Sequence, residues 1–250
     1  MGQLQNKTAV ITGGNSGIGY ATAADFLAKG AKVLITGRKP EAVQQAAAAL
    51  GKADSFIADQ GRTEDSQKLA EYVRDRYGKI DILFVNAGVA ALEPFASVTE
   101  ASFDTVMDIN LKGAFFTVQH LLPLINDGGT IILLSSVNAY AGMPGASVYS
   151  ASKAGLNSLG RTLSRELASR KIRVNVVNPG PVATPILEKA GIPKEAINEE
   201  QLAKALPIGR IGQPEEIAKL VSFLASDDAS FITGAEYNID GGIITHPLIG

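Results

Sequence analysis

The stretch Thr12-Gly13-Gly14-Asn15-Ser16-Gly17-Ile18-Gly19 lies between a short β-rich run, Lys7–Ile11, and a helical pattern from Tyr20 to Lys29. Glycine lets the backbone turn tightly and approach a ligand closely. The N-terminus of the helix that follows attracts anions. A strand, a glycine-rich turn and a helix in this order therefore predict a phosphate-binding loop. The alternative is a glycine-rich turn that binds nothing.

The same alternation of strands and helices continues along the chain. Predicted strands cover Lys32–Thr36, Ser55–Ala58, Ile80–Val85, Thr130–Leu134, Ile172–Val177 and Glu236–Ile239. Predicted helices cover Pro40–Leu50, Glu64–Tyr77, a long segment from the capping box Ser97-Val98-Thr99-Glu100 to about Leu122, and a segment from Tyr149 to about Ser169. Right-handed crossovers between such strands give a parallel sheet with helices on both faces. We predict one α/β domain over residues 1–250, a Rossmann-like doubly wound sheet of about seven strands.

Composition excludes several classes of protein. The 250 residues include 23 basic and 25 acidic side chains, a formal charge of −2, so nothing calls for nucleic acid or an anionic membrane. The most apolar long stretch, Ala114–Ile125, is too short and too polar to span a bilayer. Cysteine is absent and no signal peptide is visible, so we expect a cytoplasmic protein. His120 and His246 have no metal-like spacing, so we expect no metal site.

A second informative stretch is Tyr149-Ser150-Ala151-Ser152-Lys153, at the start of a predicted helix. Residues four apart share one helix face, so Tyr149 and Lys153 are neighbours. A nearby cation favours the phenolate of a tyrosine, whose free pKa is about 10. Ser136 follows the apolar strand Thr130–Leu134 and so lies at its carboxyl end. These groups suit proton transfer near neutral pH.

The chain resembles the short-chain dehydrogenases/reductases in Ser136, the Tyr149–Lys153 stretch and the pattern Thr-Gly-x3-Gly-x-Gly. The resemblance implies hydride transfer between a nicotinamide cofactor and a carbonyl or secondary alcohol. It implies that Tyr149 passes the proton, that Lys153 binds the nicotinamide ribose and stabilises the phenolate, and that Ser136 orients the substrate oxygen. Asn110 would complete a proton relay through a water molecule.

Asn110 also stands out from the pattern of its own helix. It interrupts an apolar stripe of Phe103, Met107, Ala114, Val118 and Leu121. A buried amide without partners costs about 1–3 kcal/mol, so Asn110 must bind something. The alternative to an active-site role is a core asparagine that braces a neighbouring strand.

The end of the second predicted strand bears on cofactor choice. Many dinucleotide folds carry an acidic residue there to bind the adenosine ribose. Here the strand ends Thr36-Gly37-Arg38-Lys39, so Gly37 offers no carboxylate and Arg38 offers a fork of donors for a 2′-phosphate. We predict a preference for NADP(H), with NAD(H) left open and with Asn15 as a second phosphate contact. In the alternative, Arg38 and Lys39 form a solvated pair.

The resemblance assigns further cofactor contacts. In Asn86-Ala87-Gly88, Val85 replaces the first Asn of the family's Asn-Asn-Ala-Gly, which puts any hydrogen bond of that side chain in doubt. Asp59 matches an adenine contact, with loop or helix capping as its alternative. The predicted cofactor site comprises Gly13, Asn15, Ser16, Gly17, Ile18, Gly19, Arg38, Asp59, Asn86, Ala87, Gly88, Tyr149, Lys153, Pro179, Gly180, Val182 and Thr184.

Positions after the strands indicate a mainly apolar substrate pocket. Its predicted residues are Ser136, Asn138, Tyr140, Met143, Tyr149, Ile186 and Leu187. Pro185–Leu206 contains Gly191-Ile192-Pro193, which breaks any continuous helix, and we predict that it forms a lid around residues 185–206. Surplus apolar residues on two helices, such as Phe115 and Leu159, predict a symmetric interface and, with the resemblance, a homotetramer.

Three other functions compete with a carbonyl reductase. One is a non-catalytic sensor or scaffold that binds the dinucleotide, which the complete set Asn110, Ser136, Tyr149 and Lys153 disfavours. Another is an NAD-dependent alcohol dehydrogenase. A third is a reductase of carbon–carbon double bonds, which the Tyr-x3-Lys spacing disfavours.

Overall fold

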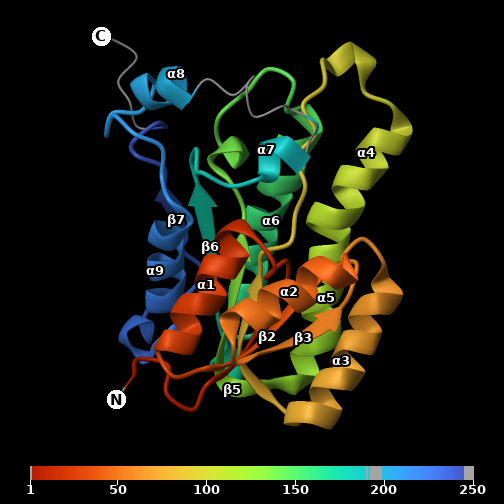
Figure 1. The fold of residues 1–250 in the computed structure, drawn as a ribbon, viewed down its shortest axis with the longest axis vertical. Coiled ribbons are helices and arrows are strands. Elements are labelled where there is room, and N and C mark those ends of the chain that lie inside the picture. The colour runs from red at the N-terminus through yellow and green to blue at the C-terminus, as the bar shows by residue number, and fades with distance from the viewer. Residues whose placement is uncertain (1, 190, 192–198, 245–250) are drawn as a thin grey trace.

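The computed structural model describes residues 2–189, 191 and 199–244. Seven parallel strands form one sheet in the order β3-β2-β1-β4-β5-β6-β7 (Figure 1). The strands are β1 (Thr8–Ile11), β2 (Lys32–Gly37), β3 (Ala53–Ile57), β4 (Ile80–Val85), β5 (Ile125–Leu134), β6 (Arg173–Pro179) and β7 (Glu236–Ile239). The strand order reverses direction between β1 and β4. The predicted doubly wound parallel sheet is therefore confirmed.

Helices cover both faces of this sheet, as expected for strands joined by right-handed crossovers. One layer contains α1 (Gly17–Ala28), α2 (Pro40–Leu50) and α9 (Pro214–Ala225), and the other contains α3 (Thr63–Tyr77), α4 (Glu100–Met107), α5 (Gly113–Leu121) and α6 (Ser147–Glu166). The short helices α7 (Ile186–Lys189) and α8 (Glu199–Lys204) lie beyond the carboxyl ends of the strands in Figure 1.

Residues that alternate along the inner strands belong to two separate hydrophobic cores. Ala9 and Ile11 of β1 join the core under α1 and α9, whereas Val10 joins the core under α3, α5 and α6. All three are fully buried. A strand buried on both faces reads as a continuous apolar run, and this explains the near absence of polar residues in β1 and β4.

The predicted long helix after β4 differs from the structure in two ways. The capping box at Ser97 is wrong, because Phe95–Ser97 forms a 3-10 turn and Thr99 is the N-cap, whose side chain accepts from the Ser102 N–H. The helix also widens into a π-turn over Asp108–Lys112, which separates α4 from α5. π-turns inside helices are frequent at functional sites.

Several other boundaries differ from the predicted ones, and two of the differences bear on the site and the sheet. The first helix begins at Gly17 rather than Tyr20, so the glycine-rich loop runs directly into it. The fifth strand begins at Ile125 rather than Thr130, because buried Ile125 pairs with Ile80 before the register shifts.

Candidate active site

The glycine-rich loop after β1 has left-handed backbone conformations that glycine adopts more readily than other residues. Gly13 and Gly17 have φ values of 63° and 54°. A Cβ on Gly19 would lie 2.4 Å from the Gly13 carbonyl oxygen, closer than any real contact. The loop therefore closes tightly over the N-terminus of α1, where backbone N–H groups and the helix dipole favour a phosphate.

Residues after β4 fix the position of this loop. The Asn86 Nδ2 donates to the carbonyl oxygens of Thr12 at 2.8 Å and Gly13 at 3.1 Å. The Thr12 Oγ1 accepts from the backbone N–H groups of Asn86 and Ala87, both at 3.0 Å. Four hydrogen bonds therefore connect the loop to the end of the neighbouring strand. Val85 lies in the strand core and is 2% exposed.

The ends of β2 and β3 complete the adenosine side of the predicted site. Arg38 is exposed and makes no ion pair with any residue that the structure describes. A Cβ on Gly37 would lie 2.6 Å from the Asn15 Oδ1, so Asn15 packs directly over residue 37. The Asp59 Oδ1 accepts from the Gly61 N–H at 3.0 Å. This bond fits the loop-capping alternative and uses one of the two carboxylate oxygens.

Ser136, Tyr149 and Lys153 come together beyond the carboxyl end of β5. Ser136 is 8% exposed and Lys153 is 3% exposed. The Lys153 Nζ donates to the Leu134 carbonyl oxygen at 2.8 Å and lies 5.7 Å from the centroid of the Tyr149 ring. The Ser135 Oγ donates to the Lys153 carbonyl oxygen at 2.9 Å, which anchors α6 to the strand. The prediction that Tyr149 and Lys153 are neighbours on one helix face is confirmed, and the structure adds that the lysine is buried.

Burial dominates the proton affinities of this cluster. It raises the pKa of the Tyr149 phenol above its usual value, and hydrogen bonding with Ser136 partly opposes that rise. Burial also lowers the pKa of the Lys153 ammonium to about 8. We expected the lysine to favour the phenolate, but the pKa of Tyr149 is raised, and loss of solvation is the main cause.

Asn110 lies in the π-turn and is fully buried. Its Oδ1 accepts from the Val89 N–H at 2.8 Å, and its Nδ2 donates to the Val89 carbonyl oxygen at 2.9 Å and the Ser152 Oγ at 3.1 Å. A Cβ on Gly88 would lie 3.2 Å from the Asn110 Oδ1 and 3.5 Å from the Lys153 Nζ. Asn110 thus braces the segment after β4, which agrees with the alternative of a core asparagine that braces a neighbouring strand. It also lies beside Lys153, as the catalytic role requires.

Comparison with known proteins agrees with this geometry. A family model described as enoyl-(acyl carrier protein) reductase matches residues 13–244. Oxidoreductase asL5 of Sarocladium schorii is 42% identical over 248 residues, which cover 96% of this chain and 97% of the relative. The 3-oxoacyl-(acyl-carrier-protein) reductase FabG of Thermotoga maritima is 38% identical over 248 residues, which cover 97% of this chain and 99% of the relative. A crystal structure described as a short-chain dehydrogenase/reductase, glucose/ribitol dehydrogenase, from Brucella melitensis has a TM-score of 0.91 at 36% identity, with 97% of this chain and 98% of that chain covered.

The chain belongs to the short-chain dehydrogenase/reductase family. Members of this family are oxidoreductases that use nicotinamide dinucleotides. The glycine-rich loop fits such a cofactor, because its two left-handed glycines lead directly into the N-terminus of α1, where backbone N–H groups favour a phosphate.

The loop after β6 reaches the same region of this short-chain dehydrogenase/reductase. A Cβ on Gly17 would meet the Thr184 side chain at 3.3 Å, so Thr184 lies over the N-terminus of α1. Val182 pairs with Gly212 in an isolated bridge, and a Cβ on Gly180 would lie 2.7 Å from the Asp240 Cα. The predicted cofactor residues of this loop are therefore held between α1 and the segment that follows β7.

Several predicted substrate residues lie in the loop after Ser136. The Asn138 N–H donates to the Ser136 Oγ at 3.2 Å, and the Asn138 Nδ2 contacts the Met143 Sδ at 3.8 Å. Met143 is 43% exposed. Ile186 and Leu187 belong to α7, but the Leu187 side chain lies outside what the structure describes. The substrate assignments stay predictions.

Tyr140 makes contacts that the sequence does not indicate. Its hydroxyl donates to the Glu236 carboxylate, which also binds the Asn157 Nδ2 at 2.9 Å and the Arg161 guanidinium. Asn157 lies about 12 Å along α6 from Tyr149, at 1.5 Å per residue. The Tyr140 hydroxyl is thus held beside Asn157, two turns of α6 away from Tyr149. This leaves the Tyr140 ring as the part that could contact a substrate. Burial and the Glu236 carboxylate raise the pKa of Tyr140 to about 12.

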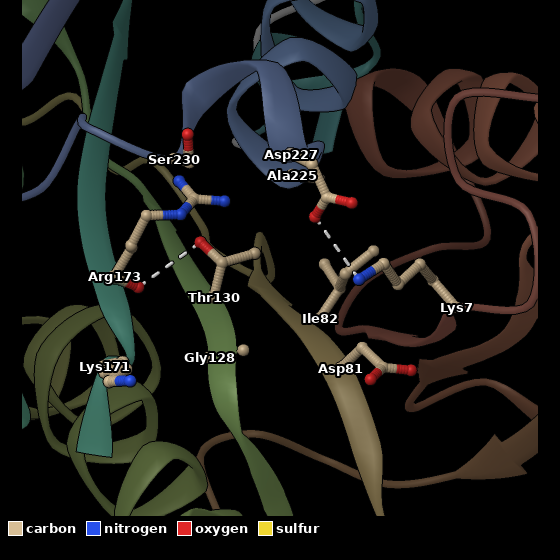
Figure 2. A pocket seen from close by; sticks show the side chains of 11 residues that line it. Lys7, Asp81, Ile82, Gly128, Thr130, Lys171, Arg173, Ala225, Asp227 and Ser230 are labelled. Carbon is tan, nitrogen blue, oxygen red and sulfur yellow. Dashed lines mark hydrogen bonds and ion pairs between the residues drawn. The ribbon is translucent and has the colours of Figure 1, made fainter.

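A separate hollow of about 220 Å³ lies at the opposite, amino edge of the sheet (Figure 2). Four of its charged groups, Lys7, Asp81, Arg173 and Asp227, have partners within the protein. The Lys7 Nζ pairs with Asp227 at 3.4 Å, and the Arg173 guanidinium donates to the carbonyl oxygens of Ser226 and Ile232. We therefore assign this hollow a structural role, holding the start of β6 to the end of α9.

Among the described residues, no cluster of three or more His, Asp or Glu side chains is arranged to hold a metal ion. None of the helices described combines the length and the apolar character needed to cross a membrane. His246 belongs to residues 245–250, which lie outside the described part of the chain.

Proposed function

We propose that this protein is an NADP(H)-dependent carbonyl reductase or secondary-alcohol dehydrogenase with Tyr149 as its general acid and base. The observation that carries the proposal is the buried Lys153 ammonium 5.7 Å from the Tyr149 ring, next to Ser136. Burial of an ammonium is costly, so a lysine kept at this place points to function.

The bound nicotinamide supplies or accepts the hydride. In reduction, the Ser136 hydroxyl binds the substrate carbonyl oxygen, and Tyr149 donates its phenolic proton to that oxygen as negative charge develops. In oxidation, Tyr149 takes the alcohol proton back. A raised Tyr149 pKa keeps the phenol protonated at neutral pH, the state that reduction needs.

Lys153 and Asn110 would support this proton transfer. Among the described residues the Lys153 Nζ has one hydrogen-bond acceptor, the Leu134 carbonyl oxygen, and as an ammonium it carries three N–H donors. The others are free to bind the nicotinamide ribose and a water molecule. Asn110 would hold that water beside the lysine and link Tyr149 to solvent.

Three features support the choice of NADP(H). Gly37 gives no carboxylate to the adenosine ribose, Arg38 is exposed without an ionic partner among the described residues, and the Asn15 side chain lies beside residue 37. An arginine fork binds a phosphate with two parallel hydrogen bonds. NAD(H) use is the competing proposal.

A ketone or aldehyde is the substrate class that we propose. The Thermotoga maritima relative is named as a reductase of a 3-oxoacyl group, which contains a ketone. The description of the family model names enoyl reductases instead, and this favours a reductase of carbon–carbon double bonds as the second candidate. The adjacent turns of Tyr149 and Lys153 on α6 favour the carbonyl reaction.

We also propose a lid, a homotetramer and a cytoplasmic location. The lid prediction rests on α7 and α8, since residues 190 and 192–198 lie outside the described chain. For the tetramer, Val118 and Leu156 on the same two helices are buried in the core, so the proposal rests on Phe115, which is 42% exposed, and on partly buried Leu159. Light scattering at micromolar concentration tests the tetramer.

A panel of ketones, aldehydes, secondary alcohols and enoyl thioesters, assayed with NADPH and NADH, tests the proposed function. We expect turnover of carbonyl compounds with NADPH. Turnover of enoyl thioesters alone would select the second candidate. Tight dinucleotide binding without any turnover would select the sensor or scaffold.

A further inference from the structure

Gln60 follows Asp59 at the carboxyl end of β3 and is 8% exposed. Its Nε2 donates to the Ala87 carbonyl oxygen at 2.8 Å and to the Ile109 carbonyl oxygen at 2.9 Å. Both acceptors are carbonyls, so the amide nitrogen must face them. One side chain thus connects three segments of the predicted site: the end of β3, the residues after β4, and the π-turn.

The backbone around Gln60 also packs closely against the π-turn and the start of α5. A Cβ on Gly113 would lie 1.9 Å from the Gln60 carbonyl oxygen, and a Cβ on Gly61 would lie 3.0 Å from the Ile109 side chain. The Gly113 N–H in turn donates to the Asp108 carbonyl oxygen, five residues earlier, which is the bond of a π-turn. The widened turn is therefore built where the helix meets Gln60.

Ile109 precedes Asn110, and Ala87 lies two residues before Val89. Gln60 donates to the carbonyl oxygens of Ile109 and Ala87 and so clamps these two segments together. Asn110 forms a second clamp, with hydrogen bonds of 2.8 and 2.9 Å to the N–H and the carbonyl oxygen of Val89. These two clamps lie side by side and fix the same two segments. Asn110 cannot shift along the helix without breaking the bonds of Gln60.

The oxygen of the Gln60 amide, unlike its nitrogen, gains nothing from its position. This Oε1 is buried and has no hydrogen-bond partner among the residues that the structure describes. An apolar side chain of equal length would fill the space without this orphan acceptor. The two Nε2 bonds are thus the feature that sets glutamine apart from methionine at this position.

We propose that Gln60 is a positioning residue for Asn110, which couples the adenosine side of the site to the proton relay. The inference rests on the proposed function, because it assumes that Asn110 acts in catalysis. Gln60 does not touch the reacting atoms. It acts by holding the π-turn in the place where the Asn110 side chain meets Lys153.

The test is a double-mutant cycle between Gln60→Met and Asn110→Ala, with kcat, KM and cofactor dissociation constants for each variant. Methionine keeps the volume and removes both donors. We expect kcat to fall by about 10- to 100-fold in Gln60→Met, with NADPH binding unchanged, as for a small misplacement of a catalytic group. In the Asn110→Ala background the same change should have no further effect on kcat. A purely structural role would lower kcat by the same factor in both backgrounds.

Gln67→Met is the matched control, because Gln67 is exposed on α3. It should leave kcat unchanged. If Gln60→Met does not fold, Gln60→Asn replaces it, since its shorter amide cannot reach both carbonyls, and the same results are expected. Full activity of a folded Gln60 variant, with Asn110→Ala inactive, would overturn the inference alone. Full activity of Asn110→Ala would overturn the catalytic role of Asn110 in the proposed function and the inference with it.

Discussion

The Asn15 side chain occupies the space that any side chain at residue 37 would need. A Cβ on Gly37 would lie 2.6 Å from the Asn15 Oδ1 and 2.8 Å from the Val43 Cγ2. The absence of a side chain at Gly37, at the end of β2, therefore makes room for the Asn15 side chain of the glycine-rich loop. This packing leaves Arg38 as the first charged group that a phosphate on the adenosine ribose would meet.

Arg38→Ala should remove most of the preference for NADPH. A charge-assisted hydrogen bond contributes about 1.5–3 kcal/mol, or roughly 10- to 150-fold in affinity. NADH binding should change little. The measurement is kcat/KM with both cofactors, and Lys39→Ala is the matched control because it removes a neighbouring cation without a planar fork. Wild-type preference for NADH would contradict the assignment of Arg38.

Gly37→Asp should destabilise the protein, and changing Asn15 as well should recover part of the loss. The new Cβ overlaps the Asn15 Oδ1 and the Val43 Cγ2, and overpacking of this kind costs about 1–3 kcal/mol. Asn15→Ala removes the first overlap, so Asn15→Ala/Gly37→Asp should melt higher than Gly37→Asp. With Arg38→Ala added, the triple variant should prefer NADH. Equal melting temperatures for Gly37→Asp and the double variant would show that the Asn15 side chain moves away freely.

Tyr140→Phe should lower the free energy of unfolding by about 1–2 kcal/mol, because the Glu236 carboxylate loses a donor and the Asn178 Nδ2 loses an acceptor. Urea unfolding measures this change. Tyr20→Phe is the control, since no hydrogen bond of the Tyr20 hydroxyl is found in the described chain. A stability loss no greater than in the control would mean that the Tyr140 contact contributes nothing.

Lys153 should make the stability of the cofactor-free protein depend on pH. Burial lowers its pKa from 10.5 to about 8, so between these values the unfolded chain binds more protons than the folded one. Stability then rises with pH across this window, by up to roughly 3 kcal/mol, and this gain is lost as the pH falls towards 8. Lys153→Met should lack this pH-dependent contribution to the free energy of unfolding. The difference in unfolding free energy between wild type and variant should therefore change between pH 8 and 10.5. A difference that stays constant over this range would contradict the prediction.

The sequence predicts local features of this molecule well. Alternating apolar runs and helix patterns indicate the doubly wound sheet, because the inner strands are buried on both faces and each crossover is right-handed. The neighbourhood of Tyr149 and Lys153 follows from helix geometry alone. Both inferences depend on residues close together in the chain.

Contacts between distant residues are what the sequence does not reveal. Nothing in Asp108–Lys112 marks a π-turn, because the turn arises where the helix meets Gln60, far away in the chain. Likewise, the Tyr140 hydroxyl binds Glu236, which lies 96 residues further on. The strand that brings this carboxylate to the loop has only four residues.

Tyr149→Phe tests the central claim most directly, because it keeps the ring and removes only the proton donor. The measurement is kcat for reduction of a carbonyl substrate with NADPH, beside the dissociation constant of NADPH for wild type and variant. We predict that kcat falls by at least the ~10²–10⁴-fold typical of general acid–base groups, while NADPH binding is retained. A variant that keeps most of its activity would contradict the assignment of Tyr149 as the proton donor.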